Sequence, residues 1–239
     1  MGGPSLDVLR AQARDCRKCD LWARATQTVF GEGPAHAAIL LVGEQPGDQE
    51  DRQGHPFVGP AGRLLATALE RAGIDRAATY VTNAVKHFKW VASDGRGKRR
   101  IHQKPNTTEV RACQPWLLAE IEAVAPRVIV CLGATAAQSL LGSAFRVTQN
   151  RGKALPGPHG AAIVATVHPA SILRGDPDTR EAELAQFVED LRAAAAAAGP
   201  SITDPARACA ATARATARRP VRARPASGRP RPGSPPRSA

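Results

Sequence analysis

Short apolar runs, rich in β-branched residues, alternate along the chain with longer segments in which apolar residues recur every three or four positions. The short runs cover residues 37–43, 79–85, 127–133 and 161–167. The longer segments cover residues 62–74, 108–124, 135–142 and 180–198. Alternating strands and helices are typical of a parallel sheet covered by helices on both faces. The pattern therefore predicts an α/β fold, a three-layer α/β/α sandwich around a central, mainly parallel four-stranded sheet.

Polar, Gly and His residues gather in the segments that follow the expected strands. These segments cover residues 43–62, 86–105, 133–138 and 168–176, and three of the four hold more such residues than a tight turn requires. In open α/β sheets, ligands bind beyond the carboxyl ends of the strands. We therefore expect the chemistry of this chain to lie in these segments.

The positive charge of the chain is concentrated at its C-terminus. Of the formal net charge of +12, residues 200–239 contribute +8, from nine Arg and one Asp, and they also contain eight Pro. A segment with so few large apolar residues cannot offset the entropy of ordering. We expect a folded domain over residues 1–199 and a disordered tail over 200–239. The Arg residues of the tail indicate either nucleic-acid contact or a G+C-rich coding sequence.

No apolar run approaches the roughly 18 residues that a membrane span needs, and the first residues lack the apolar core of a signal peptide. We therefore expect a cytoplasmic protein that has no membrane partner.

Five cysteines in a reducing compartment indicate metal ligation or plain burial rather than disulfides. Cys16 and Cys19 form a C-x-x-C pair, Cys113 falls in an expected helix and Cys131 ends an expected strand. A zinc ribbon normally repeats the close pair, whereas an iron-sulfur cluster accepts scattered ligands. The residues alone leave open a cluster, a zinc site, or Cys113 and Cys131 as ordinary buried thiols. Cys209, in the tail, has no expected role.

Four short motifs follow one another along the chain. They are GEQPGD at 43–48, GHPFVGPAG at 54–62, TN at 82–83 and HPASILR at 168–174. Together they resemble the uracil-DNA glycosylase superfamily, from about Cys16 to Arg174. The resemblance implies an enzyme that excises uracil from DNA, and it identifies the four cysteines Cys16, Cys19, Cys113 and Cys131 with the 4Fe-4S ligands of family 4 members.

Two further features resemble the X-type branch (UdgX) of that superfamily. Gln45 lies in GEQPGDQED, and residues 97–102 read GKRRIH, a basic loop that ordinary family 4 enzymes lack. Members of this branch excise uracil and stay covalently joined to the abasic sugar through the histidine of this loop, which here is His102. One departure is Ala170, which stands where the superfamily often has Ser and offers no hydroxyl to a phosphate.

The residue types suit such chemistry. A flipped base needs an aromatic platform and an amide matched to its Watson-Crick edge, roles that fit Phe57 and Asn83. His168 is expected to stabilise uracil O2 as the glycosidic bond breaks, and Glu44 to fix the tautomer of the nucleophilic His102. Core packing for Phe57 and turn capping for Asn83 are the plainer interpretations.

The remaining expected contacts are to substrate and to DNA phosphates. The substrate-binding candidates are Gly43, Gln45 and Asp48, and the DNA-binding candidates are Lys98, Arg99, Arg100, Ser171 and Arg174. A solvated charge run is the plainer interpretation of residues 98–100. Ile172 or Leu173 is expected either to fill the space left by the flipped base or to pack in the core.

Three functions compete on this sequence. The leading one is a self-trapping uracil-DNA glycosylase, a monomer whose partner is uracil-containing DNA, preferably single-stranded. The second is a conventional family 4 glycosylase that uses water and turns over. The third is a catalytically silent iron-sulfur protein that binds DNA. The presence of Glu44, Asn83, His102 and His168 together argues against the third.

Overall fold

The computed structural model describes residues 3–93 and 100–199, which belong to one compact unit ending at Gly199. The helices are α1 (Leu6–Ala13), α2 (Asp48–Gln53), α3 (Pro60–Arg71), α4 (Thr107–Val124), α5 (Ala134–Leu141), α6 (Val147–Asn150), α7 (Pro169–Arg174) and α8 (Arg180–Ala198), with short 3-10 helices at Asp20–Ala23, Arg76–Ala78 and Pro158–Gly160. The strands are β1 (Ile39–Gly43), β2 (Tyr80–Asn83), β3 (Trp90–Ala92), β4 (Arg100–His102), β5 (Val128–Leu132), β6 (Ala154–Pro156) and β7 (Ala162–Thr166). The expected tail, 200–239, lies outside the described residues.

The central sheet has the strand order β2-β1-β5-β7-β6, with every neighbouring pair parallel except β6 and β7. The α/β class and the mainly parallel sheet are thus confirmed. The sheet has five strands, however, and not the expected four. The added strand, β6, has three residues and ends at Pro156, so it presents no apolar run that the sequence pattern could reveal.

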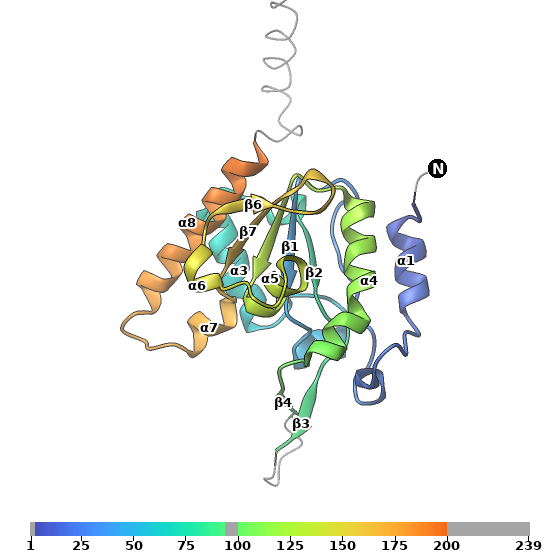
Figure 1. Ribbon diagram of the computed structural model, residues 1–239. Helices are drawn as coiled ribbons and strands as arrows, with labels where there is room; N and C mark the ends of the chain where they lie inside the picture. Colours follow the sequence, from blue (N-terminus) through green and yellow to red (C-terminus); the bar gives the residue numbers. More distant parts are fainter. Residues whose placement is uncertain (1–2, 94–99, 200–239) are drawn as a thin grey trace, which may run out of the picture. The chain divides into compact units, whose positions relative to one another are not determined.

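Alternate residues of the sheet face two separate apolar layers. Leu41, Val130 and Val164 pack with side chains of α3, α7 and α8. Leu40, Ile129 and neighbouring residues pack with α4 and α5 on the opposite face. Figure 1 shows α8 and α3 on one side of the sheet and α4 on the other. Both faces are buried because parallel strands are covered on each side by crossover helices.

Strands β3 and β4 form a separate antiparallel ribbon, in which Trp90 pairs with His102. The ribbon projects below the central sheet in Figure 1. Contacts from several parts of the chain hold the described part of the ribbon. Trp90 Nε1 donates to the carbonyl of Arg24 (2.9 Å), Gln45 Nε2 donates to Gln103 O at its base (3.0 Å), and Arg100 binds α2. The ribbon therefore presents His102 from outside the sheet.

Within residues 3–93 and 100–199, no helix is both long and apolar enough to cross a membrane.

Candidate active site

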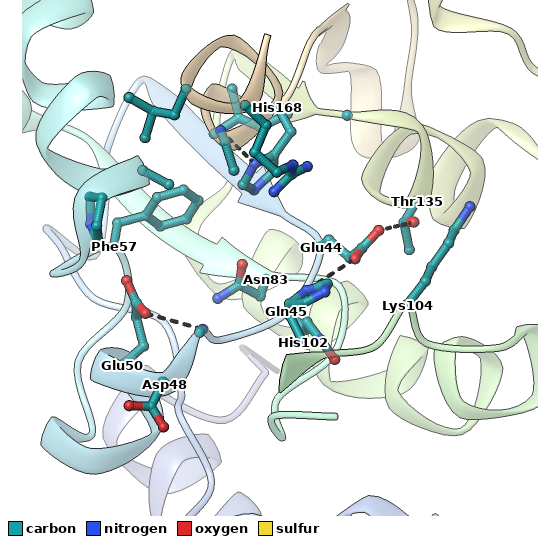
Figure 2. A pocket seen from close by; sticks show the side chains of 18 of the residues that line it. Glu44, Gln45, Asp48, Glu50, Phe57, Asn83, His102, Lys104, Thr135 and His168 are labelled. Carbon is teal, nitrogen blue, oxygen red and sulfur yellow. Dashed lines mark hydrogen bonds and ion pairs between the residues drawn. The ribbon is translucent and has the colours of Figure 1, made fainter. Parts of the chain in front are cut away.

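A pocket of about 520 Å³ lies where the carboxyl ends of β1, β2, β5 and β7 meet the ribbon. The segments that follow these strands build its wall, as expected for a parallel sheet. Figure 2 shows the polar side chains converging on it. Of the expected site residues, those that line the pocket are Glu44, Gln45, Asp48, Phe57, Asn83, His102, His168 and Arg174.

One wall of the pocket consists of an aromatic ring and a buried amide. Asn83 ends β2 and is 3% exposed, and it pairs in register with Gly43 of β1. A Cβ at Gly43 would clash with Asn83 Oδ1 and lie 2.6 Å from the Phe57 ring. Gly43 thus contributes space, since no larger residue lets the ring and the amide approach each other so closely.

The loop that carries Phe57 is held in a strained conformation. Phe57 has φ +59°, a value that costs a non-glycine residue about 1 kcal/mol or more. Its backbone lies so close to Gly62 that a Cβ there would overlap the Phe57 carbonyl. The buried Glu50 carboxylate accepts from the amides of Gly47 (3.1 Å) and Gly59 (2.8 Å) and so joins the two loops on either side of α2. These contacts fix the Phe57 ring beside the pocket.

His168 is neutral, and its tautomer follows from one hydrogen bond. Its Nδ1 accepts from the backbone amide of Ala170 (3.1 Å), so the proton of the neutral ring resides on Nε2. Burial lowers the pKa of His168 to about 4, with Arg174 and His102 adding to the effect. The Phe57 and His168 rings stack with centroids 6.4 Å apart. A neutral N–H donor therefore stands beside the aromatic platform.

His102 enters the opposite side of the pocket from the end of β4. Its Nε2 lies 3.5 Å from Glu44 Oε1, and its side chain is 49% exposed. Burial lowers the pKa of His102 and Arg174 lowers it further, while the Glu44 carboxylate opposes both. The ring is thus neutral near pH 7 and retains a nitrogen lone pair.

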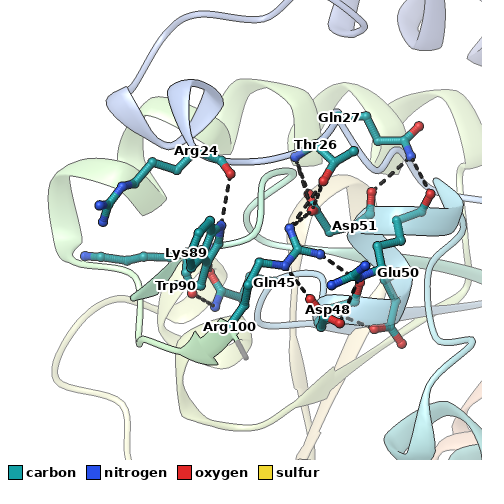
Figure 3. A network of polar contacts seen from close by, with 12 residues as sticks. Arg24, Thr26, Gln27, Gln45, Asp48, Glu50, Asp51, Lys89, Trp90 and Arg100 are labelled. Carbon is teal, nitrogen blue, oxygen red and sulfur yellow. Dashed lines mark hydrogen bonds and ion pairs between the residues drawn. The ribbon is translucent and has the colours of Figure 1, made fainter. Parts of the chain in front are cut away.

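Arg100, for which we expected a phosphate contact, has intramolecular partners in this structure. Its side chain is only 10% exposed and binds Asp48 and Asp51, the latter at 2.5 Å (Figure 3). It also lies over the rings of Phe88 (5.3 Å) and Trp90 (5.5 Å). Four of the five N–H donors of this guanidinium are engaged within the protein, so Arg100 anchors the ribbon to α2 and Thr26.

Two pocket residues expected to bind substrate also have structural partners. The side-chain nitrogen of Gln45 donates to the carbonyls of Gln103 (3.0 Å) and Lys89 (3.3 Å), and its oxygen accepts from Lys89 N (3.1 Å). Its amide therefore closes the base of the ribbon. Burial disfavours the charged form of Asp48, but Arg100 and Arg52 outweigh it and hold the pKa of Asp48 below its ordinary value.

The other expected DNA contacts lie around the mouth of the pocket or outside the described residues. Lys98 and Arg99 are outside them. Ser171 is exposed and donates to His168 O (2.7 Å), so it also stabilises the turn that follows His168. Leu173 lines the pocket, whereas Ile172 is buried in the core at 1% exposure. Of the two wedge candidates, only Leu173 reaches the site.

Comparison with known proteins agrees with this geometry. The family model "Uracil DNA glycosylase superfamily" matches residues 30–192. The chain belongs to the uracil-DNA glycosylase superfamily. It is 36% identical over 191 residues to a type-4 uracil-DNA glycosylase of Thermotoga maritima, covering 79% of this chain and 92% of that protein.

Other members of the superfamily give the same picture. A type-4 uracil-DNA glycosylase of Archaeoglobus fulgidus is 36% identical over 176 residues, which is 71% of this chain and 83% of the relative. A type-5 uracil-DNA glycosylase of Pyrobaculum aerophilum is 27% identical over 213 residues, 82% of this chain and 88% of the relative. Membership in the superfamily supports uracil-DNA glycosylase activity, with DNA as the substrate.

Three of the four expected cluster ligands lie near one another in this superfamily member. Cys19 and Cys113 pack in one small apolar cluster, and Cys16 Sγ accepts from Trp116 Nε1 (3.2 Å). Burial raises the pKa of Cys113 to about 11, with Lys86 opposing it and the thiols of Cys19 and Cys16 adding to it. In the described part of the chain, no three metal-ligating side chains are close enough to hold a single metal ion. An iron-sulfur cluster is larger than a single ion and can take its ligands from several helices and loops, so this spacing is compatible with one.

The structure does not bring Cys131 to the other three. It lies on β5 among Leu40, Ile129 and Ala165, fully buried in the layer under α4 and α5. Burial alone raises the pKa of Cys131 to about 12, with no contribution from another thiol. Its position in the strand points it into the apolar core, away from the small cluster that holds Cys19 and Cys113, so the described residues give its expected ligand role no support.

Several polar residues in and around the site carried no role in the sequence analysis. Thr135 and Lys104 line the pocket, and His87 is buried (4% exposed) directly after Lys86, whose amide donates to Cys113 Sγ (3.2 Å). Thr135 and Lys104 lie in the segments that follow β5 and β4. Their position directly after strands could have marked them as site residues. A single Thr or Lys in such a segment, however, has no property that sets it apart from the other polar residues there.

Proposed function

We propose that this protein excises uracil from DNA and then becomes covalently joined, through His102, to C1′ of the abasic sugar. The observation that carries this proposal is the facing arrangement in one pocket. Phe57, Asn83 and His168 line one side, and a neutral His102 paired with Glu44 lines the other. The first three suit a base, and the last two suit the sugar to which it is attached.

Base reading follows from the amide of Asn83. Its nitrogen donates to uracil O4 and its oxygen accepts from uracil N3–H, whereas cytosine presents the opposite pattern and leaves both groups mispaired. The base stacks on the Phe57 ring, in the space that Gly43 leaves open. Because Asn83 is almost fully buried, a mispaired amide loses more than it would in water.

Bond cleavage separates charge in the pocket. The electron pair of the C1′–N1 bond leaves with uracil, so negative charge develops on the base and positive charge on C1′. The Nε2–H of His168 donates to uracil O2 without giving up its proton. The leaving uracil anion takes a proton from water.

Capture uses the lone pair of His102. One imidazole nitrogen forms a bond to C1′, and the ring becomes a cation that keeps a proton on its other nitrogen. The Glu44 carboxylate, 3.5 Å from the ring, balances this charge and can accept that proton. A C1′–imidazole bond has no easy hydrolytic route, so one protein molecule is consumed for each uracil.

A denaturing gel tests this proposal against the two alternatives. The protein is mixed with labelled single-stranded DNA containing one uracil, and with the same DNA containing thymine. We expect a denaturant-stable 1:1 adduct with the uracil strand only. Release of many uracils per protein without a shifted band would indicate the conventional enzyme that uses water. No release and no shifted band would indicate the silent DNA-binding protein.

We also propose that the three clustered thiols hold a 4Fe-4S cluster. A backbone amide and an indole N–H point at the sulfurs of Cys113 and Cys16, as suits thiolate ligands whose charge must be stabilised. With Cys131 pointing into the apolar core, His87 is the ligating side chain nearest in sequence to the Lys86–Cys113 contact, and we assign it the fourth position. When bound, such a cluster stabilises the fold by joining the N-terminal segment to α4.

A further inference from the structure

Thr135 connects helix α5 to the carboxylate that faces the nucleophile. It is the second residue of α5, it lines the pocket, and it is 5% exposed. Its hydroxyl donates to Glu44 Oε2, on the far side of the carboxylate from His102. Figure 2 shows Thr135, Glu44 and His102 as one line of polar contacts.

The position of Thr135 is determined by the sheet. Gly133, the N-cap residue that precedes α5, donates its amide to Thr166 O of β7 (2.9 Å) and has φ +95°. A Cβ at Gly133 would lie 3.1 Å from His168 Cβ, so the helix start packs directly on the turn that carries His168. The first turn of α5 is therefore fixed relative to both sides of the pocket.

Two hydrogen bonds hold Glu44 in place, one to its backbone carbonyl and one to its carboxylate. Its backbone carbonyl accepts from Val85 N (3.0 Å), which fixes the chain after β1. The carboxylate itself is bound through Oε2 by Thr135, which leaves Oε1 to face His102 Nε2. Without the hydroxyl, the carboxylate is free to rotate, and the cations Lys104 and Arg174 line the same pocket.

We propose that Thr135 is a positioning residue that acts through Glu44 to hold His102 in place for capture of the sugar cation. This inference rests on the proposed self-trapping function and adds a residue to it. The hydroxyl forms a charge-assisted hydrogen bond, which keeps the carboxylate ionised and one of its oxygens directed at the imidazole. The hydroxyl of Thr135 acts through Glu44 on His102, so its effect is confined to the step that uses His102.

A purely structural role for Thr135 predicts something different. A Thr in the first turn of a helix often caps a backbone amide. The hydroxyl of Thr135 instead binds a carboxylate in another loop, and the cap position is occupied by Gly133. Loss of a structural contact would slow excision and capture alike, whereas loss of positioning slows capture alone.

The test measures both steps in one sample under single-turnover conditions. Uracil release reports bond cleavage, and the denaturant-stable band reports capture. In the wild-type protein we expect the two to rise together. In Thr135→Val, which removes the hydroxyl and keeps the shape, we expect uracil release near the wild-type rate. Adduct formation should be slower by roughly 10- to 100-fold, the value of a hydrogen bond to an ionised group.

Thr135→Ser restores the hydroxyl and should return capture to the wild-type rate, whereas Thr135→Ala should repeat the split seen in Thr135→Val. If release and capture remain together at the wild-type rate in Thr135→Val, or fall together, the positioning role is wrong. If the wild-type protein itself releases uracil without an adduct, the proposed function fails instead, and the role of Thr135 falls with it.

Discussion

A pocket histidine can serve as a hydrogen-bond donor or as a nucleophile, and the proposed function assigns one histidine of this site to each role. His168 accepts a backbone amide at Nδ1 and so presents Nε2–H to the base. His102 lies on a ribbon at the mouth and keeps a lone pair for the sugar. Burial favours the neutral form of both rings.

The pH dependence of trapping follows from the neutral ring of His102. Since its pKa is lowered below the ordinary value of about 6.5, the lone pair is available at neutral pH and is lost as pH falls through the lowered pKa. We expect the single-turnover rate of adduct formation to be constant near pH 7 and to have its acid midpoint below about 6.5. Arg174→Gln removes a charge that lowers this pKa and should move the midpoint upward. A wild-type midpoint above 6.5 would contradict the neutral nucleophile.

Replacing His102 by Ser should separate cleavage from capture. The small side chain leaves room for water at C1′, so uracil release should continue while the covalent band disappears. The measurement is the same gel, together with quantification of free uracil. A His102→Ser protein that still crosslinks at the wild-type yield would show that another residue is the nucleophile.

At the scale of single residues, the sequence revealed which side chains have suitable chemistry but not which partners they meet. Asn83, Phe57 and His168 were expected in the pocket and line it. Arg100 and Gln45 were expected to contact DNA and substrate because a free guanidinium or amide does so. Both are occupied by intramolecular partners far away in the sequence, and no spacing rule reveals such pairs.

At the scale of elements, the ribbon of β3 and β4 depends on one cation. Arg100 joins it to α2 through Asp48 and Asp51, and Asp51 is fully buried. Thr26 also donates to Asp51 through its amide (2.9 Å) and its hydroxyl (2.6 Å), so the N-terminal segment meets the ribbon at the same carboxylate. Three parts of the chain therefore share a single ion pair.

Arg100→Met should destabilise the fold by about 3 kcal/mol, because it leaves a buried carboxylate without its counterion. The matched control is Arg52→Met, which removes an exposed partner of Asp48 and should cost under about 1 kcal/mol. Urea unfolding of both variants measures the difference. Equal stability of the two, with a reduced salt dependence of DNA binding in Arg100→Met, would instead assign Arg100 to a phosphate.

The regular elements were the part of the fold that the sequence predicted best. The four apolar runs became β1, β2, β5 and β7, and the four periodic segments became α3, α4, α5 and α8. Strand β6 and the two strands of the ribbon were not predicted, because a strand of three residues has too few positions to show a hydrophobic period. His102 lies on one of these short strands, and it was singled out through the family resemblance and not through the hydrophobic pattern.

At the scale of the whole molecule, the cysteine contacts link the N-terminal segment to α4. We expect about four iron atoms per chain, with Cys131→Ala retaining the iron and Cys113→Ala losing it. Cys16→Ala and Cys19→Ala should behave like Cys113→Ala. Iron analysis and the brown absorbance measure this directly.

His87→Ala tests the fourth position and should lower the iron content without affecting the packing around β5. If Cys131→Ala loses iron while His87→Ala retains it, our assignment is wrong. A colourless protein rich in zinc would overturn the cluster altogether.

Removing residues 200–239 takes away +8 of charge and no residue that we assign to the pocket. If the tail binds single-stranded DNA, each phosphate lost lowers the slope of log affinity against log salt by about 0.7, so three contacts account for about 2. We expect a shallower slope and complete adduct formation at saturating DNA. An unchanged slope would favour coding bias as the origin of the Arg residues. Failure of the truncated protein to react at saturating DNA would indicate that the tail contributes to the active site.

The attachment of the ribbon gives the molecule a modular character. The pocket wall that reads the base belongs to the central sheet and its loops, whereas the nucleophile arrives on an insert held by Gln45, Arg100 and the Trp90 indole. In engineering terms, the described residues 89–93 and 100–103 dock through side chains that can be identified one by one. On the proposed mechanism, transferring this segment and its docking residues to a related enzyme that turns over converts a repair catalyst into a single-use label for uracil in DNA.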